Sequence, residues 1–587
     1  MVVKNPLKTT LNLRHLGALA GIIALGAALR FWQLDAKPLW LDEIVTALLS
    51  LGLGYGDVPT EVVSSPSSLQ QLFTLQPGVS CPEIAHATAT QSTHPPLFFC
   101  FMHQWLQWLE PVAQPLAWKL RALPALLGVG AITALYFLNR LAFSPAAGLM
   151  GAAVIAVSPF GVYLSQEARQ YSLLVLLITL SLLGLVKLQQ ELYQGRQPSL
   201  VWLGWGIVNS LGCYVHYFYI LAFAAQIFIL VVLMAWQRWR GRGMGEQRSR
   251  RAEGQGSRGE TSRSIPLLGT SAPGHLRTFP QRNLITLALV ILGVGLSYLP
   301  WLPILIEHFN SPKTSWLSSP QNIAPLYQML VGWLLMVIAL PVEDQPLAIQ
   351  IGAGLLMLAF GGWVGWKAGR GLRELGRMPQ TKSATLILGC FTACVLLQFL
   401  GIIYLLDKDI TVAPRYNYVY YPAICALLGA SFCEGRKQNK FIIFIVGLVS
   451  CVFVVFNLAF QKPYTPMQVA QNFNQSPSPL MVIIGYNDSL DLALGLSYAL
   501  SLDEIREIGE TQFAFLESSS GYNTVWQKLS ELSVSPKSLW IVAPGLERAD
   551  YPPNLALKRE LDCTRIEGEY YRIGIPYQLY RCPTIKD

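Results

Sequence analysis

Residues 441–460 read FIIFIVGLVSCVFVVFNLAF and contain no charged side chain. A run of about 20 apolar residues is long enough for a helix to cross the hydrocarbon core of a bilayer. The whole chain of 587 residues has this character, because 52% of its residues are hydrophobic and only 13% are charged. Lipid offers no hydrogen-bond partners for backbone N–H and C=O groups, so such runs must form helices, which satisfy these groups internally. The sequence therefore predicts an all-α polytopic membrane protein.

The positions of basic residues predict how the chain crosses the membrane. Lys4, Lys8 and Arg14 precede the first apolar run, which places the N-terminus in the cytoplasm. The runs 95–109 and 325–340 are shorter than a comfortable span, and we expect them to be helices lying at the membrane interface. Eleven spans are predicted, over residues 15–33, 121–139, 147–164, 171–188, 200–217, 219–236, 284–306, 347–366, 384–405, 417–433 and 441–460.

The formal net charge of +9 comes mostly from one segment. Ten arginines and three glutamates lie between Arg238 and Arg282, in a stretch that is also rich in glycine and serine. This composition predicts a disordered basic loop over 238–282, on the cytoplasmic side. Such a loop fixes the topology and contacts anionic lipid. We expect no nucleic acid partner.

The chain divides into two predicted domains. Residues 1–460 form the membrane module, in which residues 34–120 are a long outer loop, and residues 461–587 form an extracytoplasmic tail. The tail contains PLMVIIGY and SLWIVAPG, which suit buried strands, and SLDLALGLSYALS, which has helical spacing, so it is predicted to be a small α/β domain. Cys563 and Cys582 are a candidate disulfide in that compartment. No P-loop or dinucleotide fingerprint is present, so no nucleotide is expected to bind.

This topology brings polar side chains from five loops to the outer face. Each has an ordinary structural interpretation, as a solvated acid, a belt tyrosine or a snorkelling arginine. Together they match the needs of sugar transfer from a lipid phosphate, which are a carboxylate base, cations for the departing phosphate and access for the lipid tail. The candidates are Asp42, Glu43, His94, Glu167, Arg169, Tyr171, His216, Tyr217, Arg415 and Tyr416.

Five segments, taken in order, resemble a known group of enzymes. They are PLWLDEIVTALLS (38–50), THPPLFFCFMHQWL (93–106), SPFGVYLSQEARQYSLLVLL (158–177), VHYFY (215–219) and APRYNYVYYPAICALL (413–428). In order and spacing this set resembles the membrane glycosyltransferases of the C-fold superfamily. The similarity is to glycosyltransferase family 39, the aminoarabinose-transferase-like proteins and the protein O-mannosyltransferases. The resemblance spans about residues 20–460 and implies the glycosyltransferase C fold.

The resemblance implies roles for the candidate residues. Asp42 matches the first acid of the family's Asp-Glu motif and is the expected catalytic base, with Glu43 orienting it or helping it to hold a divalent metal. His94 and Arg415 fall where relatives contact the donor phosphate. Glu167 stands where relatives carry an acid that contacts sugar or acceptor. The remaining candidates for binding donor phosphate or sugar are Arg169, Tyr171, His216, Tyr217 and Tyr416.

The implied donor is a polyprenyl-phosphate monosaccharide, transferred with inversion in the plasma (inner) membrane. The acceptor is a lipid, a protein or a polysaccharide, and no cofactor beyond a possible divalent metal is implied. Two other functions remain open, a flippase for a lipid-linked sugar and a scaffold without catalysis. A transporter is expected to carry charges at mid-membrane and internal repeats. The acids here lie at the outer rim, which favours the enzyme.

Overall fold

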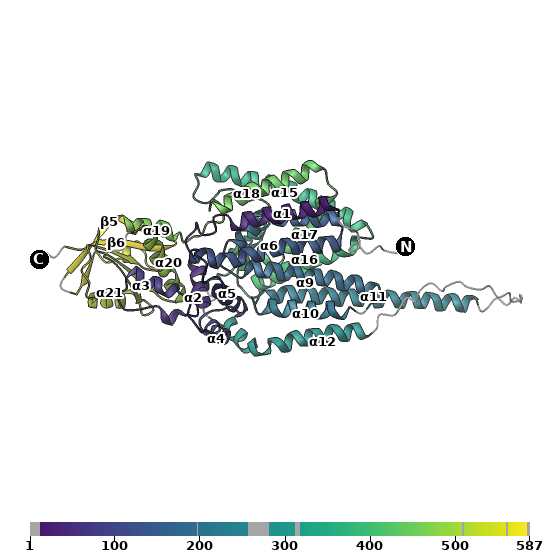
Figure 1. Cartoon of the computed structure of the whole chain (residues 1–587), viewed down its shortest axis with the longest axis horizontal. Coiled ribbons are helices and arrows are strands. Elements are labelled where there is room, and N and C mark those ends of the chain that lie inside the picture. Colours follow the sequence, from purple (N-terminus) through teal and green to yellow (C-terminus); the bar gives the residue numbers. More distant parts are fainter. Residues whose placement is uncertain are drawn as a thin grey trace, which may run out of the picture.

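The computed structural model describes residues 12–196, 198–255, 281–311, 317–506, 510–558 and 561–583. They form a long bundle of helices with a small domain of strands and helices at one end (Figure 1). The predicted fold class, an all-α polytopic module followed by a small α/β C-terminal domain, is confirmed.

Eight helical segments of the described residues are long and apolar enough to cross a membrane. Two predicted spans are shorter helices, α10 (Ser199–Cys213) and α17 (Tyr421–Cys433), and the two predicted interfacial runs are α5 (Leu97–Trp108) and α14 (Ala324–Leu335). The eight segments are α1 (Leu13–Phe31), α6 (Leu116–Ala142), α9 (Tyr171–Tyr193), α11 (Tyr219–Gln255), α12 (Gln281–Tyr298) continued by α13 (Leu302–Phe309), α15 (Leu347–Arg377), α16 (Lys382–Leu405) and α18 (Lys437–Val455).

The predicted span 147–164 is a broken helix. It consists of α7 (Pro145–Ala156) and α8 (Pro159–Ser165), which are bent by 62°. Pro159 has no backbone N–H, so it cannot continue the hydrogen-bond ladder of α7. The buried guanidinium of Arg30 in α1 donates to the freed carbonyls of Ile155, at 3.0 Å, and Ala156, at 3.1 Å. Arg30 therefore stabilises the break from a neighbouring helix.

The expected loop 238–282 is partly wrong. Helix α11 continues to Gln255, through a stretch rich in arginine, glutamate and glutamine, which are good helix formers. Residues 256–280 lie outside the described residues, and α12 begins at Gln281.

The helices differ in how deeply they lie in the bundle. In the apolar segments of α6 and α9, 67% and 72% of the residues are buried, whereas only 11% are buried in those of α12 and α15. The latter two therefore present apolar side chains outward, as helices facing lipid do. Helices α7 and α17 touch through glycines, because a Cβ on Gly429 would lie 2.5 Å from the Cα of Gly151. Small residues allow such close approach of helices in membranes.

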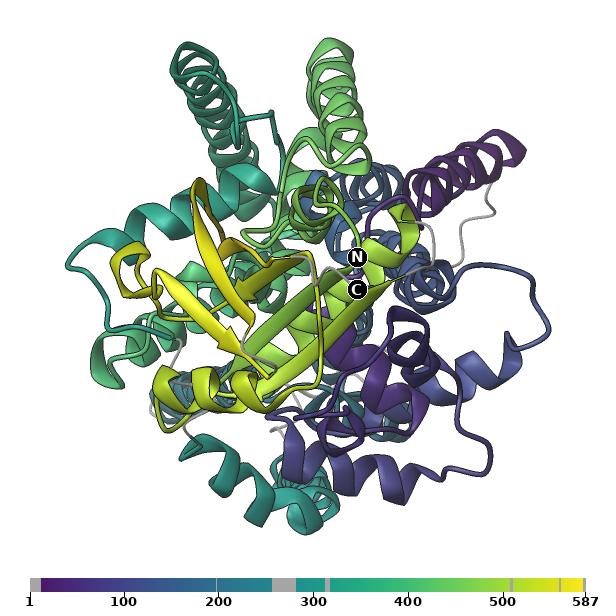
Figure 2. The ribbon, with the colours of Figure 1, turned by 90° about the vertical axis from the view of Figure 1, so that its left-hand side faces the viewer.

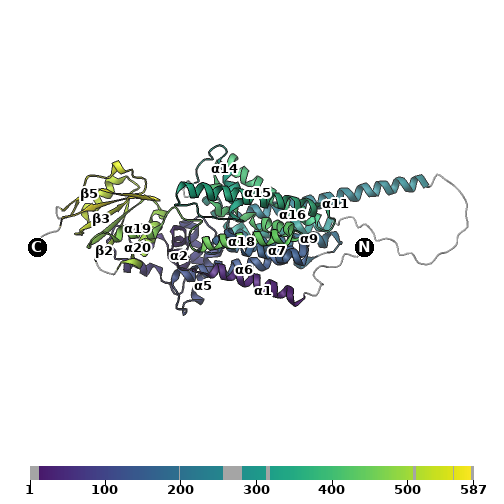
Figure 3. The same cartoon turned by 90° about the horizontal axis from the view of Figure 1, so that it is seen from above.

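The outer loop forms a layer between the bundle and the C-terminal domain (Figure 3). Its helices are α2 (Leu41–Leu51), α3 (Pro66–Gln70) and α4 (Cys81–Gln91), followed by α5. Every residue of α2 from Glu43 onward is buried. The spacing of its apolar residues would by itself suit an amphipathic helix lying in the lipid interface, but α2 is buried in protein instead. The C-terminal domain covers the face of α2 that would otherwise meet lipid or water.

The C-terminal domain is built on a six-stranded mixed sheet, in the order β2-β1-β3-β6-β5-β4. Strand β1 pairs in parallel with β2 and β3, and the other pairs are antiparallel. Figure 2 shows these strands in front of the helix bundle. The elements are α19 (Pro466–Asn474), β1 (Leu480–Tyr486), α20 (Ser489–Ile505), β2 (Thr511–Glu517), α21 (Tyr522–Glu531), β3 (Ser538–Val542), β4 (Asn554–Leu557), β5 (Leu561–Ile573) and β6 (Ile575–Arg581).

Backbone contacts fix this domain on the outer loop. Ser64 forms an antiparallel bridge with Phe513 at the free edge of β2, and both hydrogen bonds measure 2.8 Å. In α20, the hydroxyl of Ser497 donates to the carbonyl of Leu39 at 2.5 Å. The outer loop is thus bonded to the C-terminal domain both before and after Asp42.

Candidate active site

Glu43 anchors the site to the bundle. Arg121 of α6 binds its carboxylate in a bidentate pair, with nitrogen–oxygen distances of 2.8 and 2.6 Å. The Ala168 amide donates to the same carboxylate at 2.8 Å. Arg121 also donates to the carbonyls of Leu34, Lys37 and Pro38. Both side chains are almost fully buried, so this pair fixes the loop that leads into α2.

Asp42 is the adjacent residue, and its carboxylate faces a different set of groups. It lies at the start of α2, where a helix end favours negative charge. Its Oδ2 atom is buried and has no hydrogen-bond partner among the described residues. The Arg415 guanidinium approaches this atom at 3.4 Å, longer than the roughly 2.7–2.9 Å of a charge-assisted hydrogen bond. Asp42 therefore has an acceptor oxygen available to a ligand.

Arg415 comes from η7 (Pro414–Val419), which precedes α17. Helix α17 begins only at Tyr421, because the prolines of this stretch break the expected longer helix. The Arg415 guanidinium lies over the rings of Trp40, at 5.7 Å, and Tyr416, at 5.8 Å. These rings position the cation opposite Asp42.

Arg169 links the first and second outer loops. One of its terminal nitrogens donates to the Asp42 carbonyl and to the Thr46 hydroxyl, both at 3.1 Å. The other donates to Nε2 of His94 at 3.1 Å. His94 Nδ1 lies 3.0 Å from the Ser92 hydroxyl, so a neutral His94 accepts from Arg169 and donates to Ser92. The Nε atom of Arg169 is buried and has no hydrogen-bond partner among the described residues.

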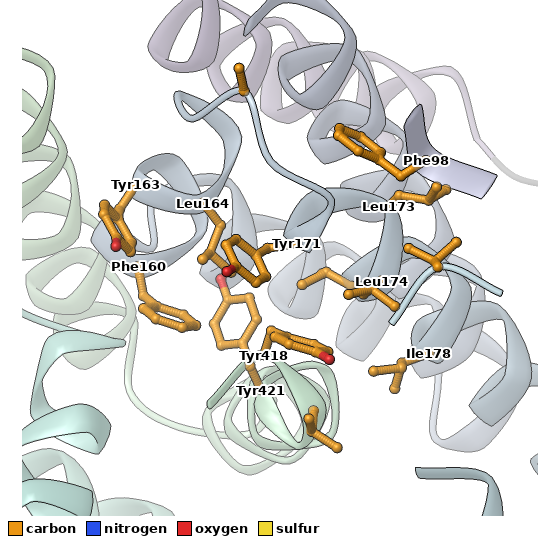
Figure 4. Close-up of a cluster of buried hydrophobic side chains, with 14 of the residues drawn as sticks. Phe98, Phe160, Tyr163, Leu164, Tyr171, Leu173, Leu174, Ile178, Tyr418 and Tyr421 are labelled. Atoms are coloured by element: carbon orange, nitrogen blue, oxygen red, sulfur yellow. The ribbon is translucent and has the colours of Figure 1, made fainter. Parts of the chain in front are cut away.

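His216 closes the other side of this cluster. Its Nδ1 accepts from the Phe218 amide at 3.1 Å, which leaves the proton of neutral His216 on Nε2. Its ring lies 5.6 Å from that of His94 and 6.0 Å from that of Tyr416. Tyr171 packs 6.3 Å from it, within an aromatic cluster that includes Tyr418 (Figure 4). These rings form the floor of the site.

Glu167 has a partner that the sequence motifs do not reveal. Lys462, just beyond α18, forms an ion pair with its Oε1 and donates to the Tyr163 hydroxyl at 3.0 Å. The ammonium also lies 4.2 Å from the centre of the Trp40 ring. A single lysine after an apolar run is an ordinary feature at a membrane rim, so the sequence offered little signal. Arg169, only two residues along the chain, bonds to Asp42, Thr46 and His94 with its guanidinium rather than to the Glu167 carboxylate.

Tyr217 is a predicted site residue that the structure places elsewhere. Its hydroxyl accepts from the Trp301 indole at 3.2 Å and lies 2.5 Å from Nδ1 of His308. The second nitrogen of His308 bonds the Ala89 carbonyl at 2.8 Å. Tyr217 therefore joins α13 to α4, and we assign it a structural role.

The charges of the cluster set the protonation of its members. Burial by itself raises the pKa of Asp42, but Arg415, Arg169 and Lys462 together hold that pKa below its usual value. Burial, aided by Arg169 and Arg415, lowers the pKa of His216 to about 3. Asp42 is thus ionised and His216 is neutral at physiological pH.

The expected Asp42–Glu43 metal site is not supported by these contacts. Both oxygens of Glu43 already accept from Arg121, so Glu43 cannot bind an ion without releasing that pair. Among the described residues, no group of three or more histidine, cysteine, aspartate or glutamate side chains could hold a metal. A divalent metal held at Asp42 with help from Glu43 stays a prediction.

Two disulfides lie at this end of the molecule. One joins the candidate pair, Cys563 and Cys582, across β5 and the end of β6. The other joins Cys81 and Cys100 and links α4 to α5, a pair that was not predicted from the sequence. The six cysteines that are free in the structure all fall in the helix bundle.

Residues 93–244 match the family of dolichyl-phosphate-mannose-protein mannosyltransferases. No curated protein matches the chain. Among solved structures, ArnT from Cupriavidus metallidurans bound to undecaprenyl phosphate is 11% identical, with a TM-score of 0.49, over 96% of this chain and 98% of that chain. The oligosaccharyltransferase of Archaeoglobus fulgidus in the apo form is 12% identical, with a TM-score of 0.42, over 83% and 64%.

Similarity this low to solved structures carries no argument about activity. The family match is different in kind, because it covers the segment that supplies His94, Glu167, Arg169 and His216. The resemblance that the motifs predicted is therefore confirmed between residues 93 and 244, where this chain is similar to the protein mannosyltransferase family.

Proposed function

We propose that this protein is a membrane glycosyltransferase that moves one monosaccharide from a polyprenyl-phosphate donor to an acceptor. One observation carries the proposal. An ionised carboxylate whose Oδ2 atom accepts no hydrogen bond among the described residues, that of Asp42, stands beside Arg415 and Arg169, which come from distant parts of the chain. The family match to enzymes of this kind supports it.

Asp42 acts as general base in the proposed reaction. Its carboxylate takes the proton of an acceptor hydroxyl or amine as that oxygen or nitrogen attacks the anomeric carbon. The bond from this carbon to the phosphate oxygen breaks, and the electron pair leaves with the phosphate. A single displacement of this kind inverts the anomeric centre.

The cations of the site stabilise the negative charge that develops on the leaving group. The phosphodiester donor carries one negative charge, and the departing polyprenyl phosphate carries two. Arg415 and the unpartnered Nε–H of Arg169 are placed to bind this phosphate, and Nε2–H of His216 adds a neutral donor. A bound phosphate also counters the arginines and so raises the pKa of Asp42, which makes it a stronger base when donor is present.

We further propose that the site faces the extracytoplasmic side of the plasma (inner) membrane, with the N-terminus in the cytoplasm. Both disulfides lie at the end of the molecule that carries the site, and disulfides persist in oxidising compartments. Arginines 238–251, which follow the apolar part of α11, support a cytoplasmic position for the opposite end.

The test compares membranes with wild-type protein and with Asp42→Asn, supplied with extracts of lipid-phosphate sugars. Mass spectrometry of donor and product should show transfer in the wild type and a loss of at least about 100-fold in the variant, since a positioned base supplies roughly 10²–10⁴-fold. Asp35→Asn, an exposed acid of the same loop, is the matched control and should transfer normally.

Unchanged transfer by Asp42→Asn would refute the mechanism. A flippase gives a different result in liposomes, because it would move donor across the bilayer when no acceptor is present. A scaffold would give no donor consumption in either assay.

A further inference from the structure

The Lys462–Glu167 pair lies beside the proposed transfer site but has no role in the mechanism above. Glu167 is the acid of the second outer loop, and its side chain is only 6% exposed. Lys462 occupies its Oε1 atom, whereas Oε2 is buried and has no hydrogen-bond partner among the described residues. A buried carboxylate oxygen without a partner is costly, which points to a ligand that donates to it.

The pair adjoins the Asp42 cluster through Trp40. The Lys462 ammonium and the Arg415 guanidinium both lie over the Trp40 ring, at 4.2 and 5.7 Å from its centre. The indole Nε1–H of Trp40 is also buried without a partner among the described residues. One donor and one acceptor without partners, next to the base and the phosphate cations, suit the hydroxyl groups of a sugar.

We propose that Lys462 and Glu167 form part of the donor-sugar subsite and make it selective for a neutral sugar over an amino sugar. This inference rests on the proposed function. The carboxylate that could recognise an ammonium group is already paired with Lys462, so Glu167 presents an oxygen acceptor without a free negative charge.

The charges of the whole site agree with a neutral sugar. Arg169, Arg415 and Lys462 face Asp42 and Glu167, which leaves one excess positive charge, and a phosphodiester donor cancels it. When the acceptor proton passes to Asp42, the excess rises to two, and the departing phosphate then carries two negative charges. The site is therefore balanced before and after transfer only if the sugar is uncharged.

Other nearby charges do not alter this balance in favour of an amino sugar. Arg121 and Glu43 neutralise each other. Lys37 is bonded to the Val454 carbonyl, and burial, together with Arg121 and Lys462, lowers its pKa to about 7, so it adds only part of a positive charge at neutral pH. The next acids, Asp488 and Asp491, accept from backbone amides at the start of α20.

The test measures binding of three soluble probes to the full-length protein in detergent: farnesyl phosphate, farnesyl phosphate esterified to a neutral hexose, and the same ester of an amino sugar. Wild type should bind the hexose ester about tenfold or more tighter than the amino-sugar ester, because like charges placed together are strongly unfavourable. Lys462→Met should reduce this ratio by about tenfold, and Lys462→Arg should keep it.

Two further variants separate selectivity from folding. Lys528→Met removes a lysine from another Lys–Glu pair, exposed and formed with Glu61, and should leave the ratio unchanged. Glu167→Gln leaves Lys462 unpaired and should increase discrimination against the amino sugar.

The outcomes distinguish the inference from the proposed function. Equal or tighter binding of the amino-sugar ester by wild type overturns the neutral-sugar subsite. A ratio unchanged in both Lys462→Met and Glu167→Gln overturns the role of the pair. If farnesyl phosphate and both esters fail to bind, the proposed function itself is wrong.

Discussion

Glu43→Gln tests whether Glu43 positions the site or takes part in the chemistry. In the structure its carboxylate accepts from two nitrogens of Arg121 and from the amides of Ala168 and Trp40. A glutamine offers one acceptor oxygen, so its amide nitrogen would face donors. The change also leaves the Arg121 charge buried without its counterion, because the two side chains are only 1% and 2% exposed.

The expected loss of stability is about 3–5 kcal/mol, the range for breaking a buried ion pair on one side. Thermal unfolding of the protein in detergent measures it. Transfer activity should fall together with the folded fraction. Arg121→Met should destabilise by a similar amount, since it strands Glu43 and three backbone carbonyls.

The double variant supplies the control. Glu43→Gln with Arg121→Met should be less destabilised than the sum of the single variants, by roughly 0.5–3 kcal/mol, because each single variant leaves an uncompensated charge and the double variant leaves none. Asp35→Asn, in the same loop, should unfold as the wild type does. If Glu43→Gln unfolds like the wild type yet transfers no sugar, the positioning role is refuted and Glu43 belongs to the chemistry.

Two further predictions concern pH and redox state. The pKa of His216 is lowered to about 3 in the folded protein. Between roughly pH 6.5 and 3, therefore, this histidine takes up a proton only in the unfolded chain. The free energy of unfolding should fall as pH falls through that window, by at most about 1.4 kcal/mol per pH unit. His216→Asn should flatten that part of the stability–pH curve, and an unchanged curve would contradict the assignment. For the redox test, whole cells are treated with a reductant and the protein is briefly unfolded. A thiol reagent that cannot cross membranes should then label Cys81, Cys100, Cys563 and Cys582 from the extracytoplasmic side alone. Labelling of any of the four only from the cytoplasm would invert the proposed topology.

The sequence predicted most of the elements of the membrane module, because the bilayer imposes a length and a composition on each span. It also predicted β1, β3 and α20 from short apolar runs and helical spacing. It failed where a contact from elsewhere overrides the local pattern. The span 147–164 breaks at Pro159, and the break is stabilised by Arg30 from α1. An arginine within the first apolar run gives no sign of that partner.

The site shows the same limit. The motifs identified Asp42, Arg169, His216 and Arg415, and the structure brings these residues to one end of the bundle. They did not reveal Lys462, which reaches Glu167 across 295 residues of sequence.

Adjacent acids in one motif acquired different roles only through tertiary contacts. The sequence by itself determined that Asp42 and Glu43 begin a helix near the membrane rim, since a helix start and the apolar runs are local properties. Successive residues on a helix point in directions about 100° apart. Glu43 therefore meets Arg121 of α6 and is neutralised, while Asp42 turns toward Arg415 and keeps an oxygen that accepts no hydrogen bond among the described residues. Which acid is available for chemistry depends on where α6 and η7 place their arginines, and only the packed bundle decides that.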